Sequence, residues 1–541
     1  MPEATALRRL VDLAEEDGRL LDRPPGPGDE PLGVRRLGRP RRHRLPEPVE
    51  GEVGQLLGDG LQPGPNRIDV AGHATSVGPV DGTPRLAGWV EGERDRILSD
   101  LFDWLRVPSI SAQPNHALDV RRSAELTAEL MRAAGLEHVA ILETAGAPSV
   151  YGDHLAAGPD RPTALVYGHH DVQPVDPLDE WHSPPFEPVV ADGPHGPECR
   201  ARGAIDDKGQ VLFQLEAVRG LLATDGRLPM NVKFLVEGEE EVGSPHFEDL
   251  LVRERDRLAC DVTVVSDTDM WAPDVPSVCV GMRGLVAFDV RIRTATMDLH
   301  SGLFGGAVPN SAHLIAKLVA SLHDDDGRVT VPGFYDDVRP LTPAEEASMA
   351  TIPLDEDAWR TMAGVGRLEG EAGRSLLERI WTRPTCEIVG IGTGYTGEGI
   401  KTIVPAQGRF KVTFRLVPDQ DPARVTDAFQ AWLAAAVPDG VEVTVTPEGG
   451  VAPALTPVDH PAMEALCRAV ARVWGKEPLF TRIGGSGPEE ALGRVLDVPV
   501  LYLGVALPDD RFHAPNERMV LAQFWKGLLA AGELWHELAD V

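Results

Sequence analysis

Short apolar runs that stop at histidine or acidic residues constrain the fold of this chain more than any other feature. The run Ala164–Tyr167 ends at Gly168-His169-His170-Asp171. A short apolar run of this kind is typical of a parallel strand that is buried on both faces. Because ligands bind beyond the carboxyl ends of the strands in open α/β sheets, we expect His169 and Asp171 to lie at a sheet edge, facing a crevice.

The same pattern, an apolar run followed by acidic residues or histidine, recurs in the strands that we expect at 231–236, 261–265 and 498–503. The first is followed by the acidic run Glu237–Glu241, the second by Ser266-Asp267, and the third by a loop that holds His513. Helical patterns separate these strands. Their alternation with the strands predicts an α/β fold with a doubly wound, mostly parallel sheet.

A change of pattern in the middle of the chain indicates an inserted domain. From Leu285 the sequence shows alternating strands with two helices, and the α/β pattern returns after about residue 450. We therefore predict a catalytic domain made of residues 86–284 and 451–541, interrupted by a smaller α+β domain at 285–450. Residues 1–85 are rich in proline and glycine and lack apolar periodicity, so we expect a disordered extension there.

The charge balance excludes several classes of partner. The 541 residues include 84 acidic and 52 basic side chains, which gives a net charge of −32. Such a surface argues against nucleic acid and against anionic membranes, because both require clustered cations. No apolar stretch reaches transmembrane length. The five cysteines are scattered without a C-x-x-C pair, which favours reduced thiols and a cytoplasmic location.

Histidine and carboxylate side chains at these strand ends and in adjoining loops are candidate metal ligands. Imidazole and carboxylate together suit zinc, manganese or cobalt. One catalytic zinc ion usually takes three protein ligands, so a set of five predicts two divalent ions, which require a bridging carboxylate. Each residue alone is weak evidence, because a lone histidine at a strand end more often makes a structural hydrogen bond, and only the joint pattern supports a metal site. The set is His169, Asp206, Glu241, Asp267 and His513.

Two adjacent glutamates suggest two different roles, one as a metal ligand and one as a base. Either Glu240 or Glu241 can bind metal while its neighbour accepts a proton from water, whose pKa the metal lowers. Asp171 lies two residues from His169 and can orient its imidazole. In isolation, the acidic run would be interpreted as a solvated loop.

Neighbouring residues of the same type mean that the assignments of ligand and base could each shift by one position. His170 offers a second imidazole beside His169, and Glu239 makes the acidic run longer. The spacing to Asp171 favours His169 as the ligand. The following Gly243-Ser244 favours Glu240 as the base.

Four motifs together resemble the dinuclear zinc peptidase family. That family includes carnosinase-like dipeptidases, glutamate carboxypeptidases, aminoacylases and acetylornithine deacetylases. The resemblance covers about residues 86–541 and is greatest to the carnosinase-like branch. The motifs are Gly168-His169-His170-Asp171-Val172-Gln173-Pro174, Arg202-Gly203-Ala204-Ile205-Asp206-Asp207-Lys208-Gly209, Glu240-Glu241-Val242-Gly243-Ser244 and Asp298-Leu299-His300-Ser301-Gly302.

The resemblance implies a role for each candidate residue of the metal site. His169 and Asp267 would bind one metal ion, Glu241 and His513 the other, and Asp206 would bridge the two. Glu240 would be the general base, and Asp171 would support His169. A cis peptide bond would follow Asp206.

The resemblance also implies substrate contacts. His300, in the inserted domain, would reach the site of a partner subunit and stabilise the oxyanion, although from the sequence alone it is equally a hydrogen-bonded loop residue. Thr402, Arg415 and Ser486 match substrate-binding positions. Arg415 could hold a terminal carboxylate through a bidentate pair, or it could be a surface arginine on a strand.

These observations predict a cytoplasmic, homodimeric metallopeptidase. It would hydrolyse dipeptides or short peptides by a water that two divalent ions activate, with zinc as the expected metal and manganese or cobalt as alternatives. The inserted domain would serve as the lid and the dimer contact. One rival is an amidohydrolase that acts on N-acyl amino acids with the same metal site. Another is a dimeric binding protein that keeps the fold without catalysis.

Overall fold

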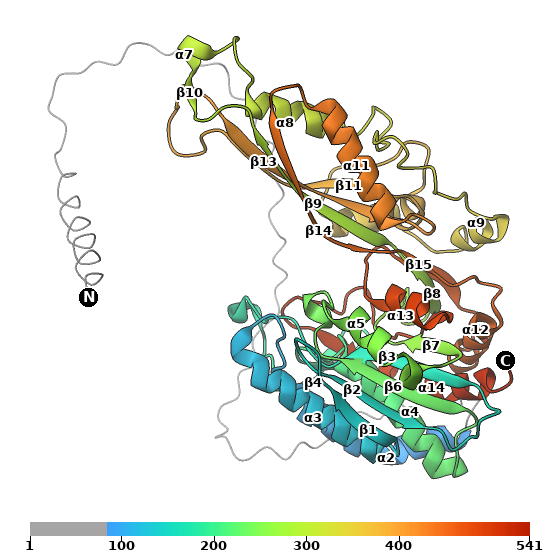
Figure 1. The fold of residues 1–541 in the computed structure, drawn as a ribbon. Coiled ribbons are helices and arrows are strands. Elements are labelled where there is room, and N and C mark those ends of the chain that lie inside the picture. Colours follow the sequence, from blue (N-terminus) through green and yellow to red (C-terminus); the bar gives the residue numbers. More distant parts are fainter. Residues whose placement is uncertain (1–83) are drawn as a thin grey trace, which may run out of the picture. The chain divides into compact units, whose positions relative to one another are not determined.

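The structure is a computed structural model and describes residues 84–541 (Figure 1). The predicted disorder of residues 1–85 therefore lies almost entirely outside the described residues. The first described element is helix α2, Pro84–Leu105. Within the described part of the chain, no helix combines the length and the apolar character needed to cross a bilayer.

A nine-stranded sheet forms the centre of the α/β domain. Its strand order is β1-β2-β6-β3-β7-β17-β8-β15, and β16 pairs with β8. The central strands β6, β3, β7 and β17 run parallel, and the antiparallel pairings flank them. The predicted α/β class with a parallel sheet centre is thereby confirmed. The strands are β1 Glu137–Leu142, β2 Ser149–His154, β3 Thr163–His169, β6 Asn231–Glu237, β7 Val262–Val265, β8 Ser277–Met282, β15 Ala454–Leu455, β16 Leu479–Ile483 and β17 Val500–Tyr502.

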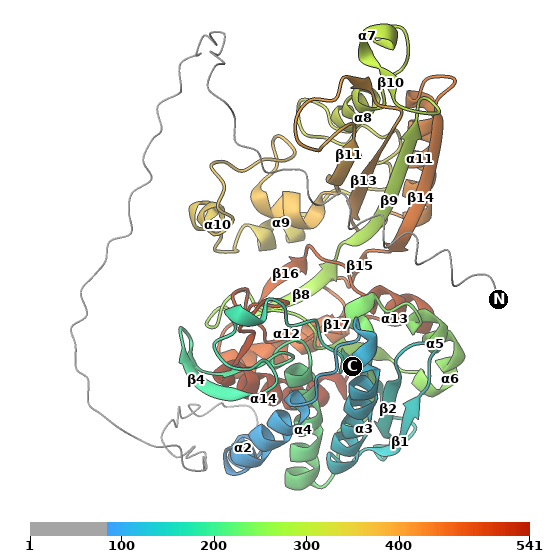
Figure 2. The same ribbon diagram turned by 90° about the vertical axis from the view of Figure 1, so that its left-hand side faces the viewer.

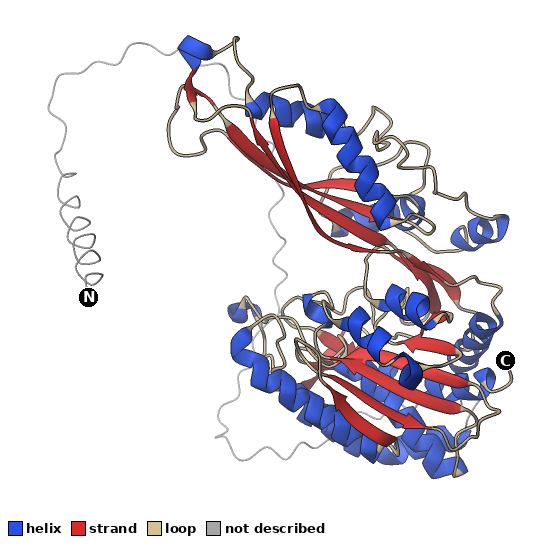
Figure 3. Ribbon diagram, in the orientation of Figure 1, coloured by secondary structure: helices blue, strands red, loops and turns tan. Residues whose placement is uncertain are grey.

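Helices cover both faces of this sheet, as a doubly wound fold requires (Figure 3). Side chains alternate between the faces of a strand, so Ala164 and Val166 of β3 pack on one side while Leu165 and Tyr167 pack on the other. The larger apolar cluster includes α2, α3 Ala117–Ala133, α4 Lys208–Asp225, α12 Pro461–Trp474 and α14 Leu521–Leu538. The smaller one includes α5 Phe247–Arg253, α6 Arg255–Leu258 and α13 Glu489–Leu496.

Three neighbouring parallel strands deliver the candidate site residues to one edge of the sheet. Strand β3 ends at His169, β6 ends at Glu237 just before the short helical turn Glu240–Val242, and β7 ends two residues before Asp267. Because the three strands are parallel and adjacent, their carboxyl ends meet at the same edge. The register of the sheet therefore brings residues about a hundred positions apart in the sequence into one place.

A second, four-stranded antiparallel sheet lies between residues 284 and 451 of the chain. Its order is β11-β13-β9-β14, and Figure 2 shows these strands side by side with α8 and α11. Alternate residues of β9 and β13 pack with those two helices in a separate apolar cluster. The elements are β9 Gly284–Arg293, β11 Thr385–Thr393, β13 Gln407–Leu416, β14 Glu442–Val451, α8 Ser311–Ala320 and α11 Pro422–Ala436.

Smaller elements complete the described chain. Strand β18, Arg518–Val520, pairs with β5, Gly196–Arg200, which pairs with β4, Val189–Gly193. In the inserted region, β10, Leu299–His300, pairs with β12, Ile403–Val404, and leads into α7, Ser301–Phe304. Two short helices, α9 Pro343–Met349 and α10 Glu356–Met362, precede a π-helical turn at Glu378–Thr382. The sequence patterns do not predict β8 or β16, which extend the central sheet beyond β17.

Candidate active site

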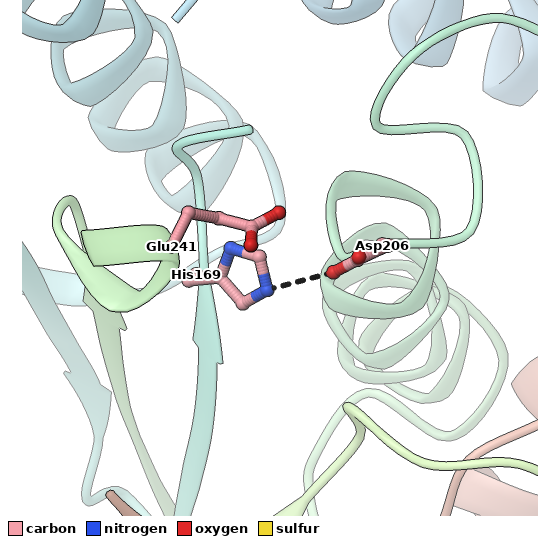
Figure 4. Close-up of side chains that lie close together, drawn as sticks. All are labelled: His169, Asp206 and Glu241. Carbon is pink, nitrogen blue, oxygen red and sulfur yellow. Dashed lines mark hydrogen bonds and ion pairs between the residues drawn. The ribbon is translucent and has the colours of Figure 1, made fainter. Parts of the chain in front are cut away.

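Two histidines face the two oxygens of one aspartate at the sheet edge. Nε2 of His169 lies 3.1 Å from Oδ1 of Asp206, and Nε2 of His513 lies 3.1 Å from Oδ2. Glu241 joins this group, with its Oε2 3.3 Å from Nε2 of His513. Figure 4 shows His169 and Glu241 approaching Asp206 from separate segments. Asp206 thus lies between the two histidines, as a bridging carboxylate does.

A second group of donor atoms shares His169. Oδ2 of Asp267 lies 3.5 Å from Nε2 of His169. The donor atoms of His169, Glu240 and Asp267 lie within 4.8 Å of one another, as do those of His169, Asp206 and Glu241. The structure therefore brings together all five predicted ligands and the predicted base.

The donor set fits divalent cations. Ligand atoms that share one zinc ion at 2.0–2.2 Å lie roughly 3 to 3.5 Å apart, which matches the separations between His169, Asp206 and His513. Oε1 of Glu241 is buried and has no hydrogen-bond partner among the described residues. Buried polar atoms normally have a partner, so an unpaired carboxylate oxygen on a residue of the donor cluster indicates a place for a cation.

The electrostatics of the cluster also indicate a cation site. Burial, together with the neighbouring Asp206 carboxylate, raises the pKa of Glu241 well above its ordinary value. Burial also raises the pKa of Glu240, to which the charge of Asp267 adds. In Asp206, burial acts in the same direction, but hydrogen bonds from His169 and His513 outweigh it and lower the pKa. A bound cation would favour the ionised form of every one of these carboxyl groups.

The structure distinguishes the neighbours that the sequence left open. His170 turns away from the donor cluster and places its Nε2 2.9 Å from the carbonyl oxygen of Pro148, and burial lowers its pKa to about 4. Glu239 accepts a hydrogen bond from the backbone N–H of Ala147 and pairs with His246. Both residues therefore serve local packing, and neither belongs to the donor groups.

Asp171 connects His169 with the two glutamates. Its carbonyl oxygen lies 3.1 Å from Nδ1 of His169, and its carboxylate accepts hydrogen bonds from the backbone N–H groups of Glu240 and Glu241. Asp171 is fully buried, so these bonds are shielded from water. The backbone carbonyl of Asp171 thus orients the imidazole, and its side chain fixes the turn that carries both glutamates.

Sequence reasoning missed two residues that position the metal-binding side chains. Gln173 donates from Nε2 to Oε2 of Glu241 at 2.7 Å. Glu517, which is fully buried, accepts hydrogen bonds from the N–H groups of Gly203, Ile205 and Asp206 and from Arg202. No sequence pattern identified Glu517 because its partners lie more than 300 residues away. The peptide bond after Asp206 is cis, which confirms the expectation from the resemblance.

The predicted substrate-binding residues fall into two places. Nη1 of Arg415, on β13, donates to Oγ of Ser486 at 2.8 Å, and burial lowers the pKa of this guanidinium. Thr402 and His300 lie elsewhere, in the inserted part of the chain. His300 ends β10, which pairs with β12, Thr402 immediately precedes β12, and both residues are exposed. Nδ1 of His300 accepts a hydrogen bond from the backbone N–H of Gly302. Within this chain, the structure does not bring His300 into the donor cluster.

A cavity of about 380 Å³ adjoins the donor cluster and includes Glu240, Asp267 and Ser486 in its lining. Sequence reasoning missed Glu489, which also lines it. This side chain is almost fully buried, and its Oε2 has no hydrogen-bond partner among residues 84–541. Burial, with the charge of Asp267, raises the pKa of Glu489 to about 8. The cavity has the size of a small-molecule site and opens onto the predicted base.

Comparison with known proteins shows relatives along most of the chain. It is similar to the human protein named Beta-Ala-His dipeptidase, with 28% identity over 84% of this chain and 92% of the relative. It is also similar to the Cys-Gly metallodipeptidase DUG1 of Saccharomyces cerevisiae, with 26% identity over 81% of this chain and 94% of that protein.

A solved structure extends the likeness to the fold. The crystal structure of an M20 family metallo-carboxypeptidase from Sulfolobus solfataricus superposes with a TM-score of 0.73 and 31% identity, covering 82% of this chain and 99% of that one. The model of peptidase family M20/M25/M40 matches residues 165–537, a span that holds every one of the donor residues described above. The chain therefore belongs to peptidase family M20/M25/M40.

Proposed function

We propose that this protein hydrolyses the peptide bond of dipeptides with the help of divalent metal ions. The observation that carries the proposal is the cluster of two histidines and four carboxylates beside a cavity of substrate size. Membership of a peptidase family and relatives named as dipeptidases support the same reaction. We further propose that the site holds two ions, most simply zinc, with Asp206 between them.

Under this proposal, some residues of the site hold the metal ions and another transfers the proton. His169 and Asp267 would hold one ion, His513 and Glu241 the other. Bound ions supply Lewis acidity, which lowers the pKa of water and polarises the scissile carbonyl. The carboxylate of Glu240 accepts the proton of the attacking water and delivers it to the departing amine. Burial keeps the pKa of Glu240 high, which suits a group that must first take and then release a proton.

Binding of the substrate would use residues in the lining of the cavity and beside it. Arg415 contacts Ser486, which lines the cavity, and its guanidinium offers donors to a terminal carboxylate. Glu489 offers a buried carboxyl to the amino group of the substrate. Thr402 and His300 are exposed on the inserted domain, residues 285–450, and would complete the site of a partner subunit. We propose a homodimer formed through this domain, where Val389 and Ile391 of β11 and Leu303 of α7 are exposed.

The rival acylase activity lacks comparable support, since the named relatives are peptidases. A cytoplasmic location remains a prediction from the scattered cysteines.

Purified protein should cleave members of a dipeptide panel, lose the activity in a chelator and regain it with zinc or manganese. N-acyl amino acids, assayed in parallel, should be poor substrates. Hydrolysis of N-acyl amino acids in preference to every dipeptide would contradict the proposal. So would dipeptide hydrolysis that persists after the metal content has fallen to zero by elemental analysis.

Replacing Glu489 by glutamine should lower kcat/KM for free dipeptides by about tenfold to a hundredfold, the usual value of a hydrogen bond to a charged group. A desamino analogue of the same dipeptide lacks the ammonium group and should be almost unaffected. Glu490→Gln is the matched control, because Glu490 pairs with Arg494 at 2.8 Å and does not line the cavity. An equal loss on both substrates would assign Glu489 a structural role instead.

A further inference from the structure

The cavity beside Glu240 has an aromatic wall that the catalytic chemistry does not require. Trp271 and Trp381 both line it, and their rings meet edge to face at 6.0 Å and 81°. Met282, Ile483 and Phe512 extend the apolar lining. Hydrolysis at the metal centre needs none of these groups. We infer that this cavity receives a large apolar side chain of the dipeptide and that Trp271 and Trp381 select it, an inference that rests on the proposed dipeptidase function.

Trp271 is held at a fixed place relative to the donor cluster. It lies four residues after Asp267 in the segment that follows β7. The backbone N–H of Met270 donates to the carbonyl oxygen of Ala506 at 2.7 Å, and that of Trp271 donates to Oγ of Ser277 at 2.8 Å. The segment that holds the candidate ligand Asp267 thus also supplies part of the cavity wall, and Asp267 and Trp271 line the same cavity.

Trp381 comes from the inserted part of the chain and has its own apolar support. It is buried with Ile352 and Leu377, and Trp271 packs against the same cluster. The wall is therefore packed from behind, and its ring positions are set before substrate binds. A preformed aromatic surface gains free energy by covering apolar area and gains little from a hydrated polar group.

The charged residues around the cavity further restrict which substrate side chains it can accept. Arg482 is ion-paired with Glu345, so its charge is already compensated. Asp269 and Glu489 add acidic groups to the lining beside Glu240 and Asp267. A substrate side chain with a carboxylate would lose water there without meeting an uncompensated cation among the side chains that line the cavity. We therefore expect phenylalanine and leucine to be accepted and glutamate to be rejected.

The test is a comparison of kcat/KM over two dipeptide series, X-Ala and Ala-X, with X as Gly, Leu, Phe, Lys or Glu. In one series the wild type should prefer Phe and Leu over Gly by about tenfold to a hundredfold, since a few buried methylene groups contribute that much discrimination. Trp271→Ala and Trp381→Ala should each reduce the Phe-to-Gly ratio to within a few fold of one. The rate on the Gly substrate should stay nearly unchanged.

Trp432→Ala is the matched control. Trp432 stacks on Phe429 in the apolar cluster of the inserted region and does not line the cavity, so its loss should leave the ratio intact. If Trp381→Ala does not fold, Trp381→Phe keeps an aromatic ring and should still shift the ratio. A wild type that cleaves no dipeptide would overturn the proposed function. A wild type that cleaves dipeptides without preferring Phe or Leu, that prefers Lys, or whose ratio survives both tryptophan substitutions would overturn this inference alone.

Discussion

Replacing Glu240 by glutamine should lower kcat on a dipeptide by about 10²- to 10⁴-fold, the range for removal of a general acid–base group. Glutamine keeps the size of the side chain but cannot accept the proton of the attacking water. Folding should be unaffected, because the carboxylate of Glu240 faces the donor cluster and makes no structural ion pair within the described residues. Steady-state kinetics on the metal-loaded variant measure the effect.

Glu241→Gln provides the contrast that fixes the register of the acidic run. Glu241 approaches His513 and accepts a hydrogen bond from Gln173, so its substitution should weaken metal binding as well as activity. Glu240→Gln should retain the metal content of the wild type by elemental analysis. If Glu240→Gln lost metal while Glu241→Gln kept it, the roles of the two residues would have to be exchanged.

Replacing Asp206 by asparagine should remove the bridge between the two halves of the metal site. The two carboxylate oxygens of Asp206 face His169 and His513, and a single amide cannot serve both sides as an anion. We expect the loss of at least one of two bound ions and a fall in activity of more than about 10³-fold, as is usual when catalytic groups act as a unit.

Thermal unfolding supplies a second measurement for this variant. An ion present at 1,000 times its dissociation constant stabilises the native state by about 4 kcal/mol, which for a chain of this length corresponds to a rise in Tm of roughly 4 °C. The wild type should show this rise on metal addition, and Asp206→Asn should show a much smaller one. Asp269→Asn is the control, because Asp269 lines the cavity but belongs to neither donor group. Two ions per chain in Asp206→Asn, with the full rise in Tm, would refute the bridging role.

The sequence predicted the donor cluster well because its chemistry follows the strands. An apolar run that ends in His169 or leads to Asp267 indicates a buried parallel strand, and parallel strands deliver their carboxyl ends to one edge. The antiparallel flanks of the sheet were harder to predict from the sequence. Strand β8 pairs with both β17 and β15, which follow it by more than 170 residues, so no local pattern reveals its place.

Residues that act through distant partners escaped prediction altogether. Glu517 has no motif of its own. It matters because it accepts hydrogen bonds from three backbone N–H groups at and near Asp206. Glu489 and Trp381 reach the cavity only because separate segments of the chain converge there. Sequence periodicity carries information about neighbours along the chain, whereas these contacts depend on how the elements pack.

The sequence by itself determined the α/β fold class, the strands that lead to the candidate site and the residue types that could hold a metal ion. Each of these follows from local patterns, since an apolar period specifies a strand and imidazole with carboxylate specifies the class of cation. The tertiary structure turned His170 away from the donors, as the spacing to Asp171 had favoured, and placed Asp206 between two histidines, as the resemblance had implied. Only the tertiary structure showed that two tryptophans line the cavity. Those choices depend on which side chain a strand directs to the shared edge, and packing across the whole sheet sets that direction.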